Sequence, residues 1–287
     1  MRPSLKEKSL GQRNSRRSAS VDPVSAQLHS RPASHGPVML MYHSVQAIKQ
    51  RPDWPWAVTL SSFERQLDFL LAEGYATPTI SEVMADPDGY RGRTAVITFD
   101  DGYVDNLEAA SALHRRGMRA TWYVVSGSIG REPAWPFDGR PAGRTMNAAE
   151  LRGLRQEGME IGSHSLSHPR LTELDPYARQ REVMQSKADI ENQIGTDVRS
   201  FAYPYGALDE ACANIVQECG YQNACTTAPG WMLREGNPFR LRRLTVFNHD
   251  SLGSYVRKLA FATHDVAWSD MARYWMQRAV QRIGVRG

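Results

Sequence analysis

The stretch "AVITFDDGYVDN" (residues 95–106) joins an apolar run to two adjacent carboxylates, Asp100 and Asp101. The run from Ala95 to Phe99 has no polar alternation, which is typical of a strand buried on both faces of a parallel sheet. Asp-Asp-Gly is also ordinary turn chemistry, because Asp side chains bond nearby amides and Gly tolerates positive φ angles. Two acids side by side at the end of a buried strand repel each other, however, so a cation or a shared proton is expected there.

Short apolar runs of the same kind recur along the chain and alternate with helical patterns. The other candidate strands are residues 37–43, 119–125, 159–164, 198–204, 221–226 and 241–247. Capping signals predict helix starts at Ser61 and Asn147, and Gly195 is expected to end a long amphipathic helix. Repeated β-α units over roughly 250 residues predict an α/β fold with a parallel sheet. We favour a barrel of seven or eight strands, because the sequence has no phosphate-binding glycine loop to support an open doubly wound sheet.

The charge of the chain is concentrated at its start. The formal net charge of the 287 residues is +4, and residues 1–35 hold seven Lys or Arg against two acids, which leaves about −1 for the remainder. The basic character therefore belongs to the tail, and we expect no nucleic acid partner for the folded body. The tail has no apolar periodic face, so residues 1–35 are expected to be disordered and the domain to occupy residues 36–287.

Two features bear on the location of the protein. The tail lacks the apolar segment of a signal peptide, and no later segment is long and apolar enough to span a membrane. We therefore expect a cytoplasmic or membrane-peripheral protein, with a periplasmic location as the alternative. Residues 264–287 are expected to form an amphipathic helix that packs on the body, with peripheral contact to a membrane surface as the alternative. Its apolar side would consist of Trp268, Met271, Trp275 and Ile283.

A histidine pair offers ligands for the expected cation. The stretch "GSHSLSHP" (residues 162–169) places His164 and His168 four residues apart at the end of a candidate strand. If the chain turns helically there, both imidazoles lie on one face, the spacing at which two histidines bind one metal. One carboxylate and two imidazoles leave a position open for water, as in catalytic zinc sites. The other Asp of the acid pair can then act as a base, because alternation along an extended backbone points the two side chains differently.

Three short motifs together resemble a known family. They are "TFDDG" (98–102), "HSLSH" (164–168) and "FAYPYG" (201–206). In this order and at these separations they resemble the polysaccharide deacetylases of the NodB-homology type, carbohydrate esterase family 4. The resemblance covers about residues 36–260. It implies a distorted (β/α) barrel and the removal of acetyl groups from N-acetylated sugars with a divalent metal, expected to be Zn²⁺.

The resemblance also implies roles for single residues. Asp100 corresponds to the general base, and Tyr205 to the residue whose backbone N–H helps the metal to hold the oxyanion. The latter role is physically sensible, because a fixed donor opposite a Lewis acid stabilises charge that appears only in the transition state. The residues that correspond to the metal ligands are Asp101, His164 and His168.

The chain departs from the family pattern in two places. Ala202 stands where many members carry the Arg partner of the catalytic Asp, and Arg243 is a candidate substitute. The late Leu-x-His motif that supplies the general acid is not recognisable, and His249 lies off its pattern. The start "VMLMYHSV" (38–45) resembles the branch that deacetylates poly-N-acetylglucosamine exopolysaccharides, in which the acid comes from the early strand. His43 is therefore the expected general acid, held charged by a neighbouring carboxylate; the alternative is a core histidine at a strand end.

The expected substrate is an N-acetylated polysaccharide or oligosaccharide of the exopolysaccharide type. Four tryptophans in loops could stack on hexose faces or anchor the core, namely Trp54, Trp56, Trp135 and Trp231. An O-acetyl esterase acting on an O-acetylated glycan is the alternative enzyme. A catalytically inactive carbohydrate-binding module is the non-enzyme alternative, although such a module has no need for a base beside a metal.

Overall fold

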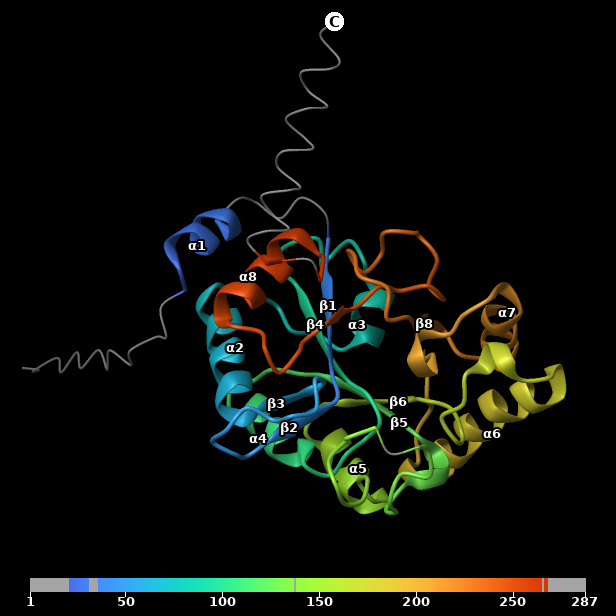
Figure 1. Cartoon of the computed structure of the whole chain (residues 1–287). Helices are drawn as coiled ribbons and strands as arrows, with labels where there is room; N and C mark the ends of the chain where they lie inside the picture. The colour runs from blue at the N-terminus through green and yellow to red at the C-terminus, as the bar shows by residue number, and fades with distance from the viewer. Residues whose placement is uncertain (1–20, 31–35, 137, 265, 268–287) are drawn as a thin grey trace, which may run out of the picture.

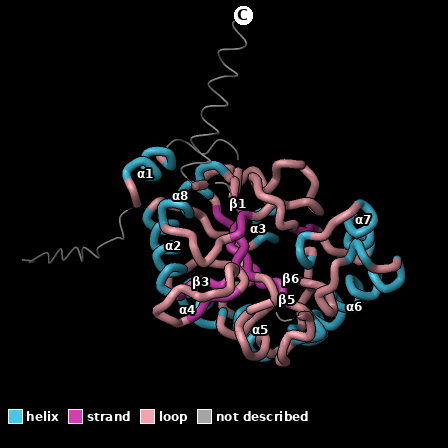
Figure 2. Tube along the Cα trace, viewed as in Figure 1, coloured by secondary structure: helices cyan, strands magenta, loops and turns pink. Residues whose placement is uncertain are grey.

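The computed structural model describes residues 21–30, 36–136, 138–264 and 266–267. Its centre is a curled sheet of seven parallel strands in the order β8-β7-β6-β5-β4-β1-β9, with helices around it (Figures 1 and 2). The strands are β1 Val38–Tyr42, β4 Ala95–Phe99, β5 Thr121–Val124, β6 Glu160–Ser163, β7 Ser200–Ala202, β8 Asn223–Cys225 and β9 Leu244–Thr245. All seven candidate strands of the sequence are present, and the prediction of a parallel (β/α) barrel is confirmed.

The two ends of the strand order meet. β9 pairs with β1, where Leu244 lies opposite Leu40. Just before β9, Leu241 forms a parallel bridge with Cys225 at the end of β8. The amide of Thr226 donates to the carbonyl of Leu241 at 2.8 Å. The segment that carries β9 therefore closes the distorted barrel between β8 and β1.

The strand that precedes the acid pair lies in the middle of the sheet. β4 runs beside β1 along its whole length, and Phe99 lies opposite Tyr42. Every residue of both strands is buried, as the unbroken apolar run predicts. The ring of Phe99 also stacks on Trp122 of β5, with centroids 4.6 Å apart. The residues that follow β1 and β4 consequently emerge side by side at the carboxyl end of the sheet.

Helices cover the outside of the barrel (Figure 1). They are α1 Pro23–His29, α2 Leu60–Ala72, α3 Ile80–Ala85, α4 Asn106–His114, α5 Ala148–Gln156, α6 Pro176–Ile194, α7 Glu210–Glu218 and α8 Leu252–Phe261, with 3₁₀ turns η1 Ser126–Ser128, η2 Leu171–Glu173 and η3 Pro204–Gly206. Contacts run from α1 to α8, α8 to α2 and α2 to α4, and from α5 through α6 to α7. Among the described helices, none combines the length and apolarity that crossing a bilayer requires.

Two of the three predicted helix ends are correct. Asn147 caps α5 and Gly195 ends α6 in the left-handed conformation, as predicted. The predicted start at Ser61 is wrong by two positions, because the hydroxyl of Thr59 reaches the amide of Ser62 and caps α2. The small second sheet was not predicted, since its strands are only three residues long: β2 Ser44–Gln46 and β3 Ala57–Thr59.

The predicted disorder of residues 1–35 is wrong for the segment that forms α1. Nε2 of His29 lies 2.7 Å from the hydroxyl of Tyr75. Arg257 of α8 donates to the hydroxyl of Ser25 at 2.7 Å. These partners come from the body of the protein, so composition alone could not reveal them. The apolar side predicted for the C-terminal helix lies outside the described residues, and that helix stays a prediction.

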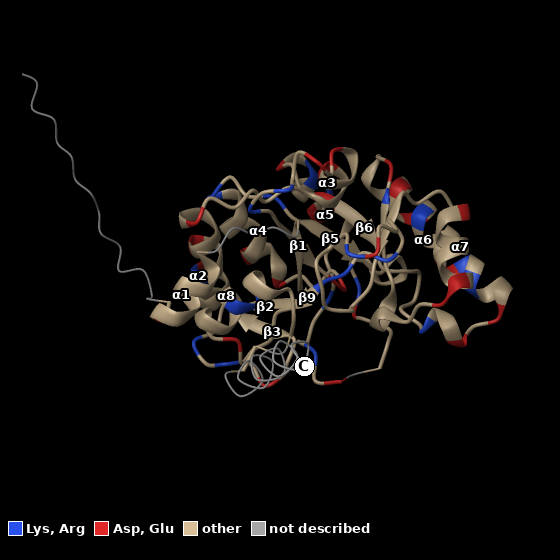
Figure 3. Cartoon of the chain, turned by 90° about the horizontal axis from the view of Figure 1, so that it is seen from above, with Lys and Arg blue, Asp and Glu red and all other residues tan. Residues whose placement is uncertain are grey.

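Positions of Lys and Arg (blue) and of Asp and Glu (red) are interspersed along the described chain (Figure 3). Many form short-range pairs, such as Lys187 with Glu191 one helical turn away at 2.7 Å. This mixing agrees with the near-zero net charge of the body.

Candidate active site

A cavity of about 470 Å³ opens at the carboxyl ends of the strands. In barrels of this kind, side chains that follow the strands gather at this end. The cavity is lined by all six predicted site residues, namely His43, Asp100, Asp101, His164, His168 and Tyr205. They come from the segments after β1, β4, β6 and β7, so the fold brings together groups that are far apart in the sequence.

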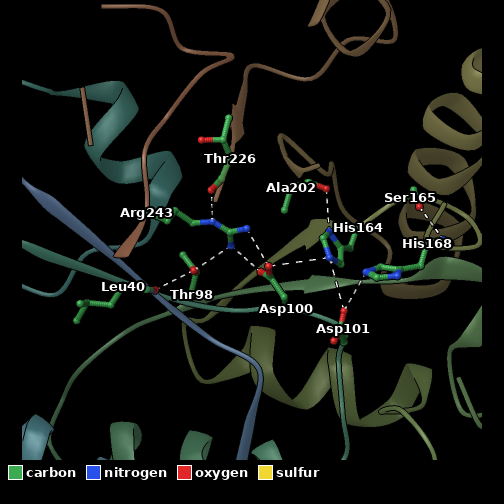
Figure 4. A network of polar contacts seen from close by, with 10 residues as sticks. All are labelled: Leu40, Thr98, Asp100, Asp101, His164, Ser165, His168, Ala202, Thr226 and Arg243. Carbon is green, nitrogen blue, oxygen red and sulfur yellow. Dashed lines mark hydrogen bonds and ion pairs between the residues drawn. The ribbon is translucent and has the colours of Figure 1, made fainter. Parts of the chain in front are cut away.

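Three of these side chains form a cluster that fits a metal ion. The candidate ligand atoms of Asp101, His164 and His168 all lie within 4.8 Å of one another. Oδ1 of Asp101 is 3.4 Å from Nε2 of His168 and 3.6 Å from Nε2 of His164 (Figure 4). This oxygen is buried and has no hydrogen-bond partner among the described atoms. A buried carboxylate oxygen facing two imidazole nitrogens suits a divalent cation.

The surroundings of the cluster support the same assignment. Burial, and next the charge of Asp100, raise the pKa of Asp101 to about 8. A cation at this position would oppose both effects and keep the carboxylate ionised. Nδ1 of His164 lies 2.8 Å from the carbonyl oxygen of Ala202, the kind of second contact that orients a metal-binding imidazole.

The backbone that carries the cluster differs from the prediction. Ser165 and His168 have φ angles of 68° and 65°, in the left-handed region that residues other than glycine rarely adopt. The two histidines therefore converge through an irregular loop, and the predicted helical turn is wrong. Asp101 has a φ of 70°. A turn after β4, not alternation along an extended strand, separates its carboxylate from that of Asp100.

Asp100 is held by a buried guanidinium. Nη1 of Arg243 donates to Oδ1 of Asp100 at 2.6 Å, and Nη2 donates to Oδ2 at 2.8 Å (Figure 4). Arg243 is fully buried, and its Nε donates to the carbonyl of Thr226. Burial raises the pKa of Asp100, but the charge and hydrogen bonds of Arg243, together with the charges of His164 and His43, outweigh this effect and lower the pKa to about 2. Arg243 thus provides the cationic partner that Ala202 cannot.

His43 lies on the cavity wall directly after β1. Its ring meets Trp54 edge to face with centroids 5.8 Å apart, and Asn106 donates to its carbonyl at 2.7 Å. Desolvation lowers the pKa of His43 to about 4 and outweighs the attraction of Asp100. The expectation that a neighbouring carboxylate keeps this ring charged is therefore not supported, because desolvation is the largest effect and the charge of Arg243 further offsets that of Asp100.

The remaining candidates divide between the cavity and the body. Trp54, Trp56 and Trp135 line the cavity, whereas Trp231 packs against the main hydrophobic core. His249 is exposed and stacks on Phe247, away from the described cavity lining.

Sequence reasoning missed several residues of the cavity wall, among them Tyr103, Asp138 and Arg170. Tyr103 directly follows the acid motif, and this adjacency was a usable signal. Asp138 and Arg170 lie in loops without a motif. The guanidinium of Arg170 lies 4.6 Å from the ring centroid of Tyr205, itself part of the third motif.

Comparison with known proteins agrees with this geometry. Residues 88–224 match the family model described as polysaccharide deacetylase. YxkH of Bacillus subtilis (strain 168), which is described by the same family name, is 29% identical over 245 residues, or 83% of this chain and 82% of that protein. The chain carries a polysaccharide deacetylase domain. This deacetylase is also 25% identical over 141 residues to the peptidoglycan-N-acetylglucosamine deacetylase PgdA of Listeria monocytogenes, a match that covers 48% of this chain and 27% of PgdA.

Solved structures share the fold of this polysaccharide deacetylase. The Streptococcus pyogenes deacetylase PplD, in complex with acetate, aligns with a TM-score of 0.69 at 22% identity and covers 78% of this chain and 98% of PplD. IcaB from Ammonifex degensii aligns with a TM-score of 0.66 at 22% identity and covers 79% of this chain and 97% of IcaB. The matched family model and the relatives identify the protein as a hydrolytic deacetylase of the NodB-homology type.

The ligand cluster predicts the behaviour of three variants. Asp101→Ala, His164→Ala and His168→Ala should each lose retained zinc, because two remaining ligands hold a metal far more weakly than three. Zinc content after gel filtration, measured by atomic emission, checks this, with circular dichroism to confirm the fold. His249→Ala is the control and should keep its zinc. Stoichiometric zinc in all three site variants would disprove the ligand set.

The ion pair between Arg243 and Asp100 predicts non-additive changes in the free energy of unfolding in a double-mutant cycle. Arg243→Met leaves the buried carboxylate of Asp100 unpaired and should lower the free energy of unfolding by about 3–5 kcal/mol, measured by urea denaturation. Adding Asp100→Asn should recover part of this loss, because no unpaired charge is then buried. Arg242→Met, which removes a more exposed pair with Glu235, should cost about 1 kcal/mol or less. Simple additivity of the two single variants would argue against the pair.

Proposed function

We propose that this deacetylase removes N-acetyl groups from N-acetylhexosamine units of an exopolysaccharide-type polymer that resembles poly-N-acetylglucosamine. The proposal includes a divalent cation, Zn²⁺, held by Asp101, His164 and His168. The observation that carries it is the fixed, ionised carboxylate of Asp100 beside this ligand cluster in one cavity. The name of the relative PgdA supports N-acetylglucosamine as the sugar.

In the proposed reaction Asp100 takes a proton from the attacking water. When bound, the cation would polarise the acetamide carbonyl and make water more acidic, which suits a base of low pKa. Arg243 keeps both carboxylate oxygens in place. The backbone N–H of Tyr205, in a left-handed turn with φ of 58°, is proposed as the donor to the oxyanion.

His43 is proposed to protonate the leaving amine. The ring is neutral in the free cavity, since desolvation lowers its pKa. It acts after it receives the proton that Asp100 has removed from water, because a carboxylate of low pKa holds that proton weakly. Nδ1 of His43 is buried without a hydrogen-bond partner among the described atoms, which leaves this nitrogen available for such a transfer.

The aromatic wall supports a sugar substrate. Trp54, Trp56 and Trp135 line the cavity, and the rings of Trp54 and Trp56 lie 5.5 Å apart. Apolar ring faces beside a few convergent polar groups suit a hexose, whose faces are apolar and whose edges are hydroxylated.

Acetate release tests the proposed activity. Oligomers of β-1,6-linked and β-1,4-linked N-acetylglucosamine should both be compared, with preference expected for the β-1,6 linkage. A chelator should abolish the release, and added zinc should restore it, because the ligand cluster would otherwise hold no Lewis acid. Release from O-acetylated xylan alone would contradict the proposal and favour an O-acetyl esterase. Release that is unaffected by the chelator would contradict the role of the metal.

The role of His43 predicts a substrate-dependent defect. His43→Ala should keep bound zinc but lose on the order of 10²-fold in the rate of N-deacetylation, as is usual for a missing general acid. The defect should shrink for an activated aryl acetate, whose leaving group needs no proton. His249→Ala is the matched control and should be nearly silent. An inactive His249→Ala with a normal His43→Ala would reverse the assignment.

A further inference from the structure

The two histidines of the ligand cluster are held in different ways. Nδ1 of His164 faces a carbonyl oxygen at 2.8 Å. Nδ1 of His168 is buried and has no hydrogen-bond partner among the described atoms. Its ring instead packs against Trp135 and Tyr205, with centroids 4.8 and 4.6 Å away. Imidazole ligands are usually oriented by a hydrogen bond at their second nitrogen. His168 lacks such a bond among the described atoms, so the orientation of its ring depends on its packing and on the backbone that carries it.

That backbone is a strained turn. Ser165 and His168, at its two ends, both lie in the left-handed region. The amide of His168 donates to the hydroxyl of Ser165 at 2.9 Å, which closes the turn on itself (Figure 4). A strained turn persists only when its surroundings determine its conformation. Contacts to the rest of the protein must therefore hold it.

The side chain of Glu182 provides such contacts from α6. It is 4% exposed and accepts three hydrogen bonds from the middle of the turn. Oε2 accepts from the amides of Leu166 and Ser167 at 3.0 and 2.8 Å, and Oε1 accepts from the hydroxyl of Ser167 at 2.6 Å. A carboxylate that accepts several hydrogen bonds holds them more strongly than a neutral acceptor does.

The turn is also held by η1. The amide of Ser126 donates to the carbonyl of Ser165, and the amide of Gly127 donates to the carbonyl of Leu166 at 2.9 Å. A Cβ atom at Gly127 would lie 2.7 Å from that same carbonyl oxygen, so a side chain at this position would push the two segments apart. Hydrogen bonds to η1 and to Glu182 therefore both tie the turn to its neighbours, and loss of the Glu182 side chain would remove three of them.

We infer that Glu182 is a positioning residue for the metal site. It acts through the turn of residues 165–168 and keeps Nε2 of His168 at 3.4 Å from Oδ1 of Asp101. It does not touch the ligands themselves. The inference rests on the proposed metal site and adds to it a residue outside the three sequence motifs.

Zinc affinity of the apoprotein tests the inference without using activity. Glu182→Ala should weaken zinc binding by roughly 10–100-fold, measured by calorimetry with a competing chelator, as is usual when a residue that orients a ligand is lost. Glu182→Gln should recover most of the affinity, because its amide oxygen can accept from both backbone amides and its NH₂ can donate to Ser167. The zinc concentration that gives half-maximal acetate release should rise by the same factor in Glu182→Ala.

A matched control lies on the same helix. Glu191 also accepts from a loop amide, that of Val198 at 2.9 Å, but it does so away from the cavity. Glu191→Ala should therefore keep the zinc affinity of the wild type. An equal loss in Glu182→Ala and Glu191→Ala would mean that α6 is only destabilised, and would overturn the inference.

The outcomes separate the two proposals. Wild-type protein that binds no zinc would refute the proposed metal site and with it this inference. Wild-type protein that binds zinc, with unchanged affinity in a folded Glu182→Ala, would refute the inference alone. If Glu182→Ala does not fold, Glu182→Asp decides, because it keeps the charge but shortens the side chain by one methylene group. Wild-type affinity in Glu182→Asp would then overturn the role of Glu182, and weakened affinity would support it.

Discussion

The ion pair between Arg243 and Asp100 is the constraint on which both the barrel and the site depend. Both groups are buried, and each would be costly to bury alone. Their bidentate contact joins the segment that closes the barrel to the central strand β4, across 143 positions of sequence. The return of the last segment beside the first strand brings Arg243 to Asp100 and helps to keep this carboxylate ionised. Completion of the fold therefore also completes the electrostatics of the proposed general base.

The fold could be predicted from the sequence wherever burial was uniform. The run from Ala95 to Phe99 is apolar on both faces because it lies between two other strands, and a pattern of this kind is visible without coordinates. Strands β2 and β3 escaped prediction because three residues are too few to show a period. Helix α1 was not predicted because its stability depends on contacts such as that of His29 with Tyr75, which form only in the folded chain.

The candidate site shows the same division between local and long-range information. Motif order and spacing were enough to predict that Asp101, His164 and His168 share one cavity, since parallel strands end at the same edge. The backbone that achieves this was not predictable, because the residue types carry no sign of their left-handed conformations. The protonation of His43 was misjudged for a related reason. A sequence shows which charges are near in the chain, but desolvation depends on the whole cavity wall.

The closure of the barrel has a consequence for partial unfolding. Among the described residues, the segment that carries Arg243 pairs with β1 over only two residues of β9, whereas β1 and β4 pair over five. A short pairing of this kind can open while the longer one stays intact, and its amides should then exchange with solvent earlier than those of β1 and β4. Such an opening would deprive Asp100 of its counter-charge while most of the barrel stays folded. The proposed general base would therefore lose its ion pair under milder conditions than those that unfold the whole protein.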